Sequence, residues 1–178
     1  MNFEQTERKG VVREGYQILL KAEARLLLPV EHKNIRLFYE NMVHACLKWA
    51  VEVHGERVRA EFEKLETIKE RSAFSTQHYR MIMRCPWQSE RHAAILCESQ
   101  LTDQWREPRK SYHRISHIWD LSEQTLLPIP QILKLFHTHL TKGTLPFRPD
   151  GIYPEGDELV FFRNATDSAP FLEKRLRR

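Results

Sequence analysis

The chain has 178 residues, of which 41% are hydrophobic and 10% aromatic, with a formal net charge of +4. This length fits one domain, and folding at this size buries about 68–70% of the surface of the extended chain. The composition excludes a disordered chain. The longest apolar run, about five residues at 26–30, excludes a helical membrane span, which needs about 20. We expect a single domain over 1–178 with flexible ends at about 1–11 and 172–178.

Charge and cysteine content favour no particular class of partner. The chain carries 28 basic and 24 acidic residues, and segment 171–178 alone contributes a net charge of +3. Binding to nucleic acid is therefore a minor alternative. The first ten residues lack the apolar core of a secretory signal, and the three cysteines form no CxxC motif. These features predict a cytoplasmic protein with reduced thiols.

Hydrophobic periodicity predicts the elements of the first half. Alternation over 11–28 predicts an extended segment that Pro29 ends. A long helix is then expected over 34–66, with one apolar face. The residues assigned to this face are Ile35, Phe38, Met42, Cys46, Trp49, Val53, Val58, Phe62 and Leu65.

The second half alternates between strands and loops, with one further helix. Strands are expected at 78–85, 93–101 and 112–119, followed by a helix over 128–140 and a strand pair, 147–153 with 158–162. Pro86 is expected to end the first of these strands, because proline cannot donate to the ladder. Strands that are neighbours in sequence, with two helices, predict an α+β fold. The expected arrangement is an antiparallel sheet covered on one face by one long and one shorter helix.

The second half also resembles a known family. A strand pair that includes AILCES at 94–99 leads to HIWDL at 117–121 and TLLPI at 125–129. Later come DG at 150–151, LVFF at 159–162 and APF at 169–171. Over about 12–171 the chain is similar to the domain of unknown function found in bacterial RsiV-type anti-sigma factors and beside the catalytic domain of some peptidoglycan deacetylases. The resemblance implies a non-catalytic binding or sensing module with an unknown ligand.

The chain departs from that family in two respects. Family members carry a Gly-Gly-Ala-His type of loop where this chain has REPRK at 106–110. Relatives are often exported or membrane-anchored, whereas no signal or anchor is expected here. Lysozyme recognition, known for some relatives, is not expected either, because lysozyme is basic and a chain of net positive charge gains no electrostatic steering towards it.

Aromatic and basic residues in two connections form the candidate binding rim. Trp, Tyr and Arg dominate the energetic hot spots of interfaces. The alternative is that both tryptophans cap the core of the sheet. The expected partner is a protein or a small ligand, with no cofactor. The rim consists of Trp87, Trp105, Arg106, Arg109, Lys110 and Tyr112.

Catalytic and metal-binding alternatives remain open beside this rim. An enzyme would need a site assembled from dispersed residues, with Glu98, His113, His117 and Asp120 as candidates. A nucleic-acid binder would use the basic tail with Arg80 and Arg84. No metal is expected, because His113 and His117 are predicted on a strand, where four residues span about 13 Å. A non-catalytic role is therefore favoured.

Overall fold

The computed structural model describes residues 1–103, 109–138, 144–166 and 169–177, with the backbone alone at 103 and 109–111. The described chain is mostly β-sheet. Its strands are β1 (Phe3–Glu14), β2 (Gln17–Pro29), β3 (Gln77–Gln88), β4 (His92–Asp103), β5 (Arg109–Asp120), β6 (Thr125–Leu126), β7 (Gly151–Glu155), β8 (Glu158–Arg163) and β9 (Leu172–Arg177). Its helices are α1 (Lys33–Lys48), η1 (Trp49–His54), α2 (Gly55–Glu63), α3 (Ile68–Ser72) and α4 (Ile129–Leu135).

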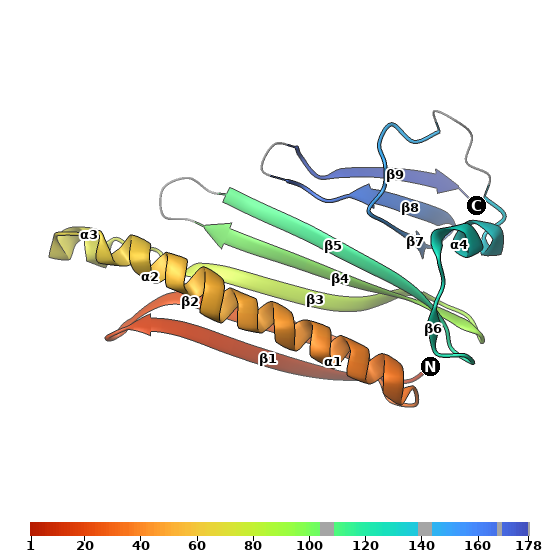
Figure 1. Cartoon of the computed structure of the whole chain (residues 1–178), viewed down its shortest axis with the longest axis horizontal. Helices are drawn as coiled ribbons and strands as arrows, with labels where there is room; N and C mark the ends of the chain where they lie inside the picture. Colours follow the sequence, from red (N-terminus) through yellow and green to blue (C-terminus); the bar gives the residue numbers. More distant parts are fainter. Residues whose placement is uncertain (104–108, 139–143, 167–168, 178) are drawn as a thin grey trace.

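The elements form three layers (Figure 1). A six-stranded sheet in the order β1-β2-β3-β4-β5-β6 lies in the middle. The continuous helix made of α1, η1 and α2 covers one face, while the sheet β7-β8-β9 and helix α4 lie on the other. The predicted α+β class is confirmed. The shorter helix differs from the expected arrangement, because Ile132 and Phe136 pack with Ala94 and Ile118 on the face opposite the long helix.

One strand pair of the large sheet is parallel. β2 and β3 run in the same direction because the long helix connects them, whereas the other neighbouring strands are antiparallel. A helical crossover of this kind carries the chain back to the end of the sheet at which β2 began, which a tight turn cannot do. The sheet is therefore mixed rather than purely antiparallel.

The two ends that were expected to be flexible are strands. Residues 3–14 form β1, which pairs along its length with β2 across a two-residue turn where Gly15 has a φ of 55°. Residues 172–177 form β9, which pairs with β8. Both segments are mostly polar and have few buried side chains, so periodicity did not reveal them. The two segments are ordered by pairing with their partner strands, β2 and β8.

The proline expected to end β3 lies within the strand. β3 continues to Gln88, and its register with β4 shifts between Arg84 and Trp87. A bulge of this kind takes up a residue that cannot donate to the ladder. The irregularity carries Trp87 onto the face of α4, where its ring meets Phe136 edge-on at 4.9 Å between centroids.

The long helix occupies the predicted range but buries a different face over its first half. Ile35, Tyr39, Val43 and Ala50 are buried against the sheet, and Val58 and Phe62 continue the buried side as expected. The expected Phe38, Trp49 and Val53 are exposed, at 37%, 46% and 59%. Met42 and Cys46 are half-buried. Tyr39 and Val43 each lie one residue after the expected Phe38 and Met42, and a spacing of four residues places Ile35, Tyr39 and Val43 on one face of α1.

The long helix crosses the sheet obliquely. Near its start, Tyr39 accepts a hydrogen bond from Trp119 of β5. Further along, the helix reaches β1, where a Cβ on Gly55 would lie 2.7 Å from a methyl group of Val12. The absence of this Cβ permits the close approach. One consequence is that part of β3, β4 and β5 lies beyond the cover of the helix.

Truncation of Trp49 should have a modest cost. We expect Trp49→Ala to lower the free energy of unfolding by about 1–2 kcal/mol, because the ring is 46% exposed and what it loses is mainly aromatic contact. Urea unfolding measures this change. A loss above about 3 kcal/mol, typical of a large core side chain, would contradict the observed helix face.

Candidate functional site

A cavity lies where the helix leaves the sheet uncovered. Its volume is about 290 Å³, and it opens beside the exposed ring of Trp49 and the exposed side chain of His113. The floor comes from the sheet and one wall from the helix. The lining residues are Cys46, Trp49, Tyr79, Met81, Cys97, Ser99, Leu101, His113 and Ile115.

The cavity is apolar with a few polar groups at defined positions. Met81 and Cys97 form part of the buried core, while Tyr79, Ser99 and Cys46 bring hydroxyl and thiol groups to the same lining. Burial raises the pKa of the Tyr79 hydroxyl. Burial also raises the pKa of the Cys97 thiol to about 12. Both groups are therefore neutral, and Cys97 is not a nucleophile, since a thiol reacts as its thiolate.

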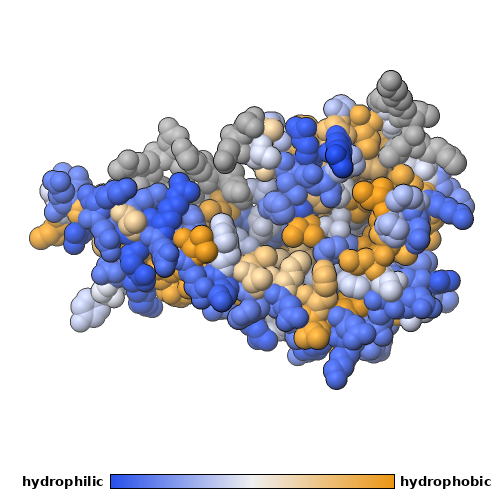
Figure 2. Space-filling model, viewed as in Figure 1, coloured by the Kyte–Doolittle hydropathy of each residue, from blue (hydrophilic) through white to orange (hydrophobic). Residues whose placement is uncertain are grey.

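The mouth of the cavity is shaped by the π-helix. Trp49, its first residue, stacks on His54 with ring centroids 5.9 Å apart and meets Tyr79 edge-on at 6.1 Å. His54 is itself held by Gln77 through a 2.8 Å hydrogen bond. π-Helical turns within α-helices are frequent at functional sites. Here the turn fixes an aromatic ring at the entrance of an apolar cavity, and apolar surface beside the long helix is visible in Figure 2.

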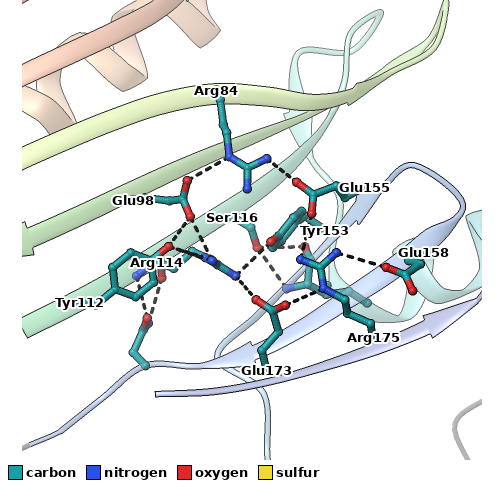
Figure 3. Close-up of polar contacts among 12 residues, drawn as sticks. Arg84, Glu98, Tyr112, Arg114, Ser116, Tyr153, Glu155, Glu158, Glu173 and Arg175 are labelled. Atoms are coloured by element: carbon teal, nitrogen blue, oxygen red, sulfur yellow. Dashed lines mark hydrogen bonds and ion pairs between the residues drawn. The ribbon is translucent and has the colours of Figure 1, made fainter. Parts of the chain in front are cut away.

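A separate polar cluster joins the two sheets (Figure 3). Its centre is Arg114, whose side chain is 9% exposed. The guanidinium lies 3.0 Å from Glu98 and 2.7 Å from Glu173, and it donates to the hydroxyls of Tyr112 and Tyr153. The Tyr112 hydroxyl in turn donates a short hydrogen bond to Glu98. β5 is thereby tied to β4, β7 and β9.

Two further arginines extend this cluster. Arg84 of β3 contacts Glu98 at 3.0 Å and also reaches Glu155 of β7. Arg175 of β9 contacts Glu155 at 3.0 Å and Glu173 at 2.7 Å. Every one of these carboxylates therefore faces at least two cationic or hydroxyl groups. The cluster holds the small sheet onto the large one.

The pKa shifts in this cluster argue against proton transfer. Burial tends to raise the pKa of Glu98, but the Tyr112 hydroxyl and the Arg84 guanidinium outweigh it and leave the pKa below its usual range. Burial alone would lower the pKa of Arg114, but the hydrogen bonds to Glu173 and Tyr112 outweigh burial and raise the pKa above its usual value. Both groups stay charged at neutral pH. A general acid or base needs a pKa near the working pH.

The four residues of the enzyme alternative do not come together. Glu98 is paired with Arg114 across the strands, so it points to the face opposite His113 and His117, which alternate with Arg114 on β5. Asp120 caps the turn after β5, where it accepts hydrogen bonds from Ser122 and the main chain. The Ser122 hydrogen bond and then the Arg91 side chain lower its pKa. The described residues contain no group of three or more metal ligands.

His117 belongs to an aromatic cluster under the start of the helix. Trp119 donates to the Tyr39 hydroxyl at 2.8 Å, and that hydroxyl lies 3.1 Å from Nδ1 of His117. The Tyr39 hydroxyl can then donate its own proton to Nδ1 of His117. Nδ1 can accept this hydrogen bond only when the imidazole is neutral. Burial lowers the pKa of His117 to about 4. The cluster is a packed core feature.

The structure separates the predicted rim. Trp87 pairs with Ala94 and Tyr112 with Gln100, and these two partners are six residues apart on β4, or about 20 Å. Trp87 is half-buried against the core beside α4. Tyr112 is engaged in the Arg114 cluster. The backbone of Arg109 and Lys110 begins β5, whereas Trp105 and Arg106 lie outside the described residues.

The arginines of the nucleic-acid alternative, Arg80 and Arg84, lie on the face of β3 opposite the helix, and Arg84 is ion-paired.

Sequence reasoning did not predict that the residues of the cavity come together, although it named His113 as a catalytic candidate and Trp49 as a core residue. Tyr79, Ser99 and His113 come from three strands, and Trp49 comes from the helix, so no local motif joins them. The exposed position of Trp49 depends on the π-helix, for which the sequence gives no signal. In the described part of the chain, no helix is long and apolar enough to cross a membrane.

The fold is shared with proteins of one uncharacterised family. Neither a protein-family model nor a curated protein matches the sequence. Two crystal structures of DUF3298 family proteins match the fold. One, from Bacteroides fragilis NCTC 9343, has a TM-score of 0.55 and 9% identity, covering 98% of this chain and 89% of that chain. The other, from Pseudomonas aeruginosa PAO1, has a TM-score of 0.51 and 12% identity, covering 98% and 88%. At these identities the likeness shows the fold alone.

Proposed function

We propose that the chain is a non-catalytic binding domain whose cavity beneath the long helix takes a small, mostly apolar ligand. The cavity carries the proposal. Its volume of about 290 Å³ lies near the lower end of the range for ligand sites, roughly 300–1,000 Å³. The ligand class that fits is a single aromatic ring or a short acyl chain with one hydrogen-bonding group.

The positions of the polar groups support this ligand class. Tyr79 and Ser99 offer hydroxyls on the floor, and His113 offers an imidazole at the mouth. Partial burial lowers the pKa of His113, against the opposing influence of Asp150, so the imidazole is neutral at neutral pH. A neutral site of this kind favours uncharged ligands, because a buried charge without a partner is costly.

Binding rather than catalysis is also supported by the state of the acidic side chains. Glu98, Glu173 and Asp120 all have ion-pair or hydrogen-bond partners that lower their pKa values. A sensing role like that of RsiV-type modules is part of the proposal and rests on the sequence resemblance over about 12–171.

Thermal unfolding with small aromatic probes tests the cavity. We expect indole or toluene at ten times its Kd to stabilise the protein by about 1.4 kcal/mol, which raises the Tm by roughly 3–5 °C for a chain of this size. Ser99→Phe fills the cavity and should remove the shift. Gln100→Phe makes the same change on the opposite face of β4 and should keep it. If neither probe shifts the Tm of the unmodified chain, or if the two variants respond alike, the cavity is not the binding site.

A further inference from the structure

The outer edge of β5 is paired over only part of its length. β4 pairs with the whole strand on one side. On the other side, β6 pairs with Trp119 and Asp120 alone. In an antiparallel strand, alternate residues direct their main-chain N–H and C=O groups to opposite sides. The N–H of Arg114 bonds away from β4, to Asn164, so the groups of Ser116 and Ile118 also face outward.

The position of Ser116 on this edge lies between two occupied positions. At Arg114, the side-chain amide of Asn164 acts as a substitute for a strand, because its Oδ1 accepts from the N–H at 2.7 Å and its Nδ2 donates to the C=O at 2.9 Å. At Ile118, the C=O accepts from the N–H of Leu127 at 2.8 Å. The main-chain N–H and C=O of Ser116 have no partner among the described residues, since its bonds to Ile152 come from the hydroxyl.

A groove of about 620 Å³ runs along this edge. Its lining includes all five consecutive residues of 113–117, together with Asp150 and 164–166. Successive strand residues point to opposite faces, so a groove lined by five in a row follows the edge itself. The wall opposite β5 is fixed in place, because the N–H of Asn164 donates to Asp150 at 2.8 Å. The groove is therefore formed before any ligand arrives.

We propose that this groove binds an extended peptide of a partner protein, one residue of which pairs its N–H and C=O with those of Ser116. Addition of an extended peptide to an open sheet edge is a common mode of recognition. The side-chain amide of Asn164 already bonds the main-chain N–H and C=O of Arg114, two residues before Ser116. The edge of β5 therefore accepts an amide group. The groove shares His113 and Ile115 with the cavity beneath the helix, but the proposal does not depend on a ligand in that cavity.

The flanking contacts define the kind of peptide that fits. Asn164 occupies the edge at Arg114 and Leu127 occupies it at Ile118, so a ligand pairs through one residue and then turns away from the strand. A long rigid strand, such as β1 of a second copy of this chain, would collide with both. A short or flexible peptide segment meets no such obstacle.

Peptide selection combined with amide exchange tests the proposal. Random heptapeptides would be selected on the unmodified chain against Ala165→Trp, which fills the groove, with Ala165→Ser as the matched control. We expect selected peptides to slow hydrogen exchange of the Ser116 amide at least tenfold. N-methylation of the one peptide bond that pairs with Ser116 should weaken binding about tenfold or more.

The N-methylated peptides are tested on the unmodified chain, so the result does not depend on the folding of a variant. The proposal is overturned if selection yields no peptide that prefers the open groove, or if the selected peptides leave Ser116 exchange unchanged. Acetamide serves as a probe for a simple carboxamide. If acetamide protects Ser116 as well as the peptides do, the site takes a side-chain amide and the peptide proposal is also overturned.

Discussion

Arg114→Met is expected to lower the free energy of unfolding by about 3–5 kcal/mol, because removing the most buried member of an ion cluster leaves the remaining carboxylates with less counter-charge. Glu98 and Glu173, at 19% and 27% side-chain exposure, would both lose their shared guanidinium. The hydroxyls of Tyr112 and Tyr153 would lose an interaction as well. Urea unfolding at neutral pH measures the loss.

Arg25→Met provides the matched control for this measurement. Arg25 also lies on a strand of the large sheet and contacts Glu7 at 3.3 Å, but its side chain is 63% exposed. Exposed pairs contribute about 0–1 kcal/mol. A similar small loss for both variants would contradict the role of Arg114 as the link between the sheets.

A second large effect is expected at acid pH, through His117. Burial lowers its folded-state pKa to about 4, while the unfolded-state value is about 6.5. Only the unfolded chain binds the proton between these values, so stability is complete above about pH 6.5 and falls as the pH drops towards 4. The total loss is about 3 kcal/mol. The rings that surround His117, those of Phe38, Tyr39 and Trp119, carry no charge to offset it.

His117→Gln separates this effect from other titrations. Glutamine keeps an acceptor for the Tyr39 hydroxyl but does not titrate, so most of the loss between pH 6.5 and 4.5 should vanish. His44→Gln, at an exposed helix position, should leave the loss in place. The carboxylates with lowered pKa values, such as Glu98, contribute only at lower pH. An unchanged slope in His117→Gln would show that this imidazole is not buried as described.

The strands that sequence predicted have at least one buried face, and β4 is buried on both faces from Ala93 to Cys97. Tyr79, Met81 and Met83 alternate with Arg80 and Ile82, and β3 follows that pattern because only the first set meets the helix. β1 and β9 escaped prediction for the opposite reason. Apart from the buried Val12, their side chains are exposed or half-buried, so their order comes mainly from main-chain pairing, which leaves no hydrophobic period.

Long-range geometry explains why the candidate sites were not predicted. The cavity depends on the angle at which the helix crosses the sheet and on the π-helix at Trp49. The groove depends on Asn164 reaching across to Arg114, fifty positions away in sequence. From the sequence alone, Arg114 would be expected to be an exposed cation on the surface. Its burial follows from the docking of β9, which periodicity did not detect.

The link between Arg114 and β9 has a consequence for the order of events during synthesis. Ribosomes make β9 after all the strands it completes, and Glu173 on β9 is one of the two carboxylates that neutralise Arg114. Until residue 173 has emerged, a nascent large sheet holds a cation that lacks half of its counter-charge, beside an edge of β8 whose main chain has no strand partner. Multi-stranded chains in this state are prone to misassembly. Pairing of β9 with β8 therefore completes the small sheet and the counter-charge of Arg114 in the same step.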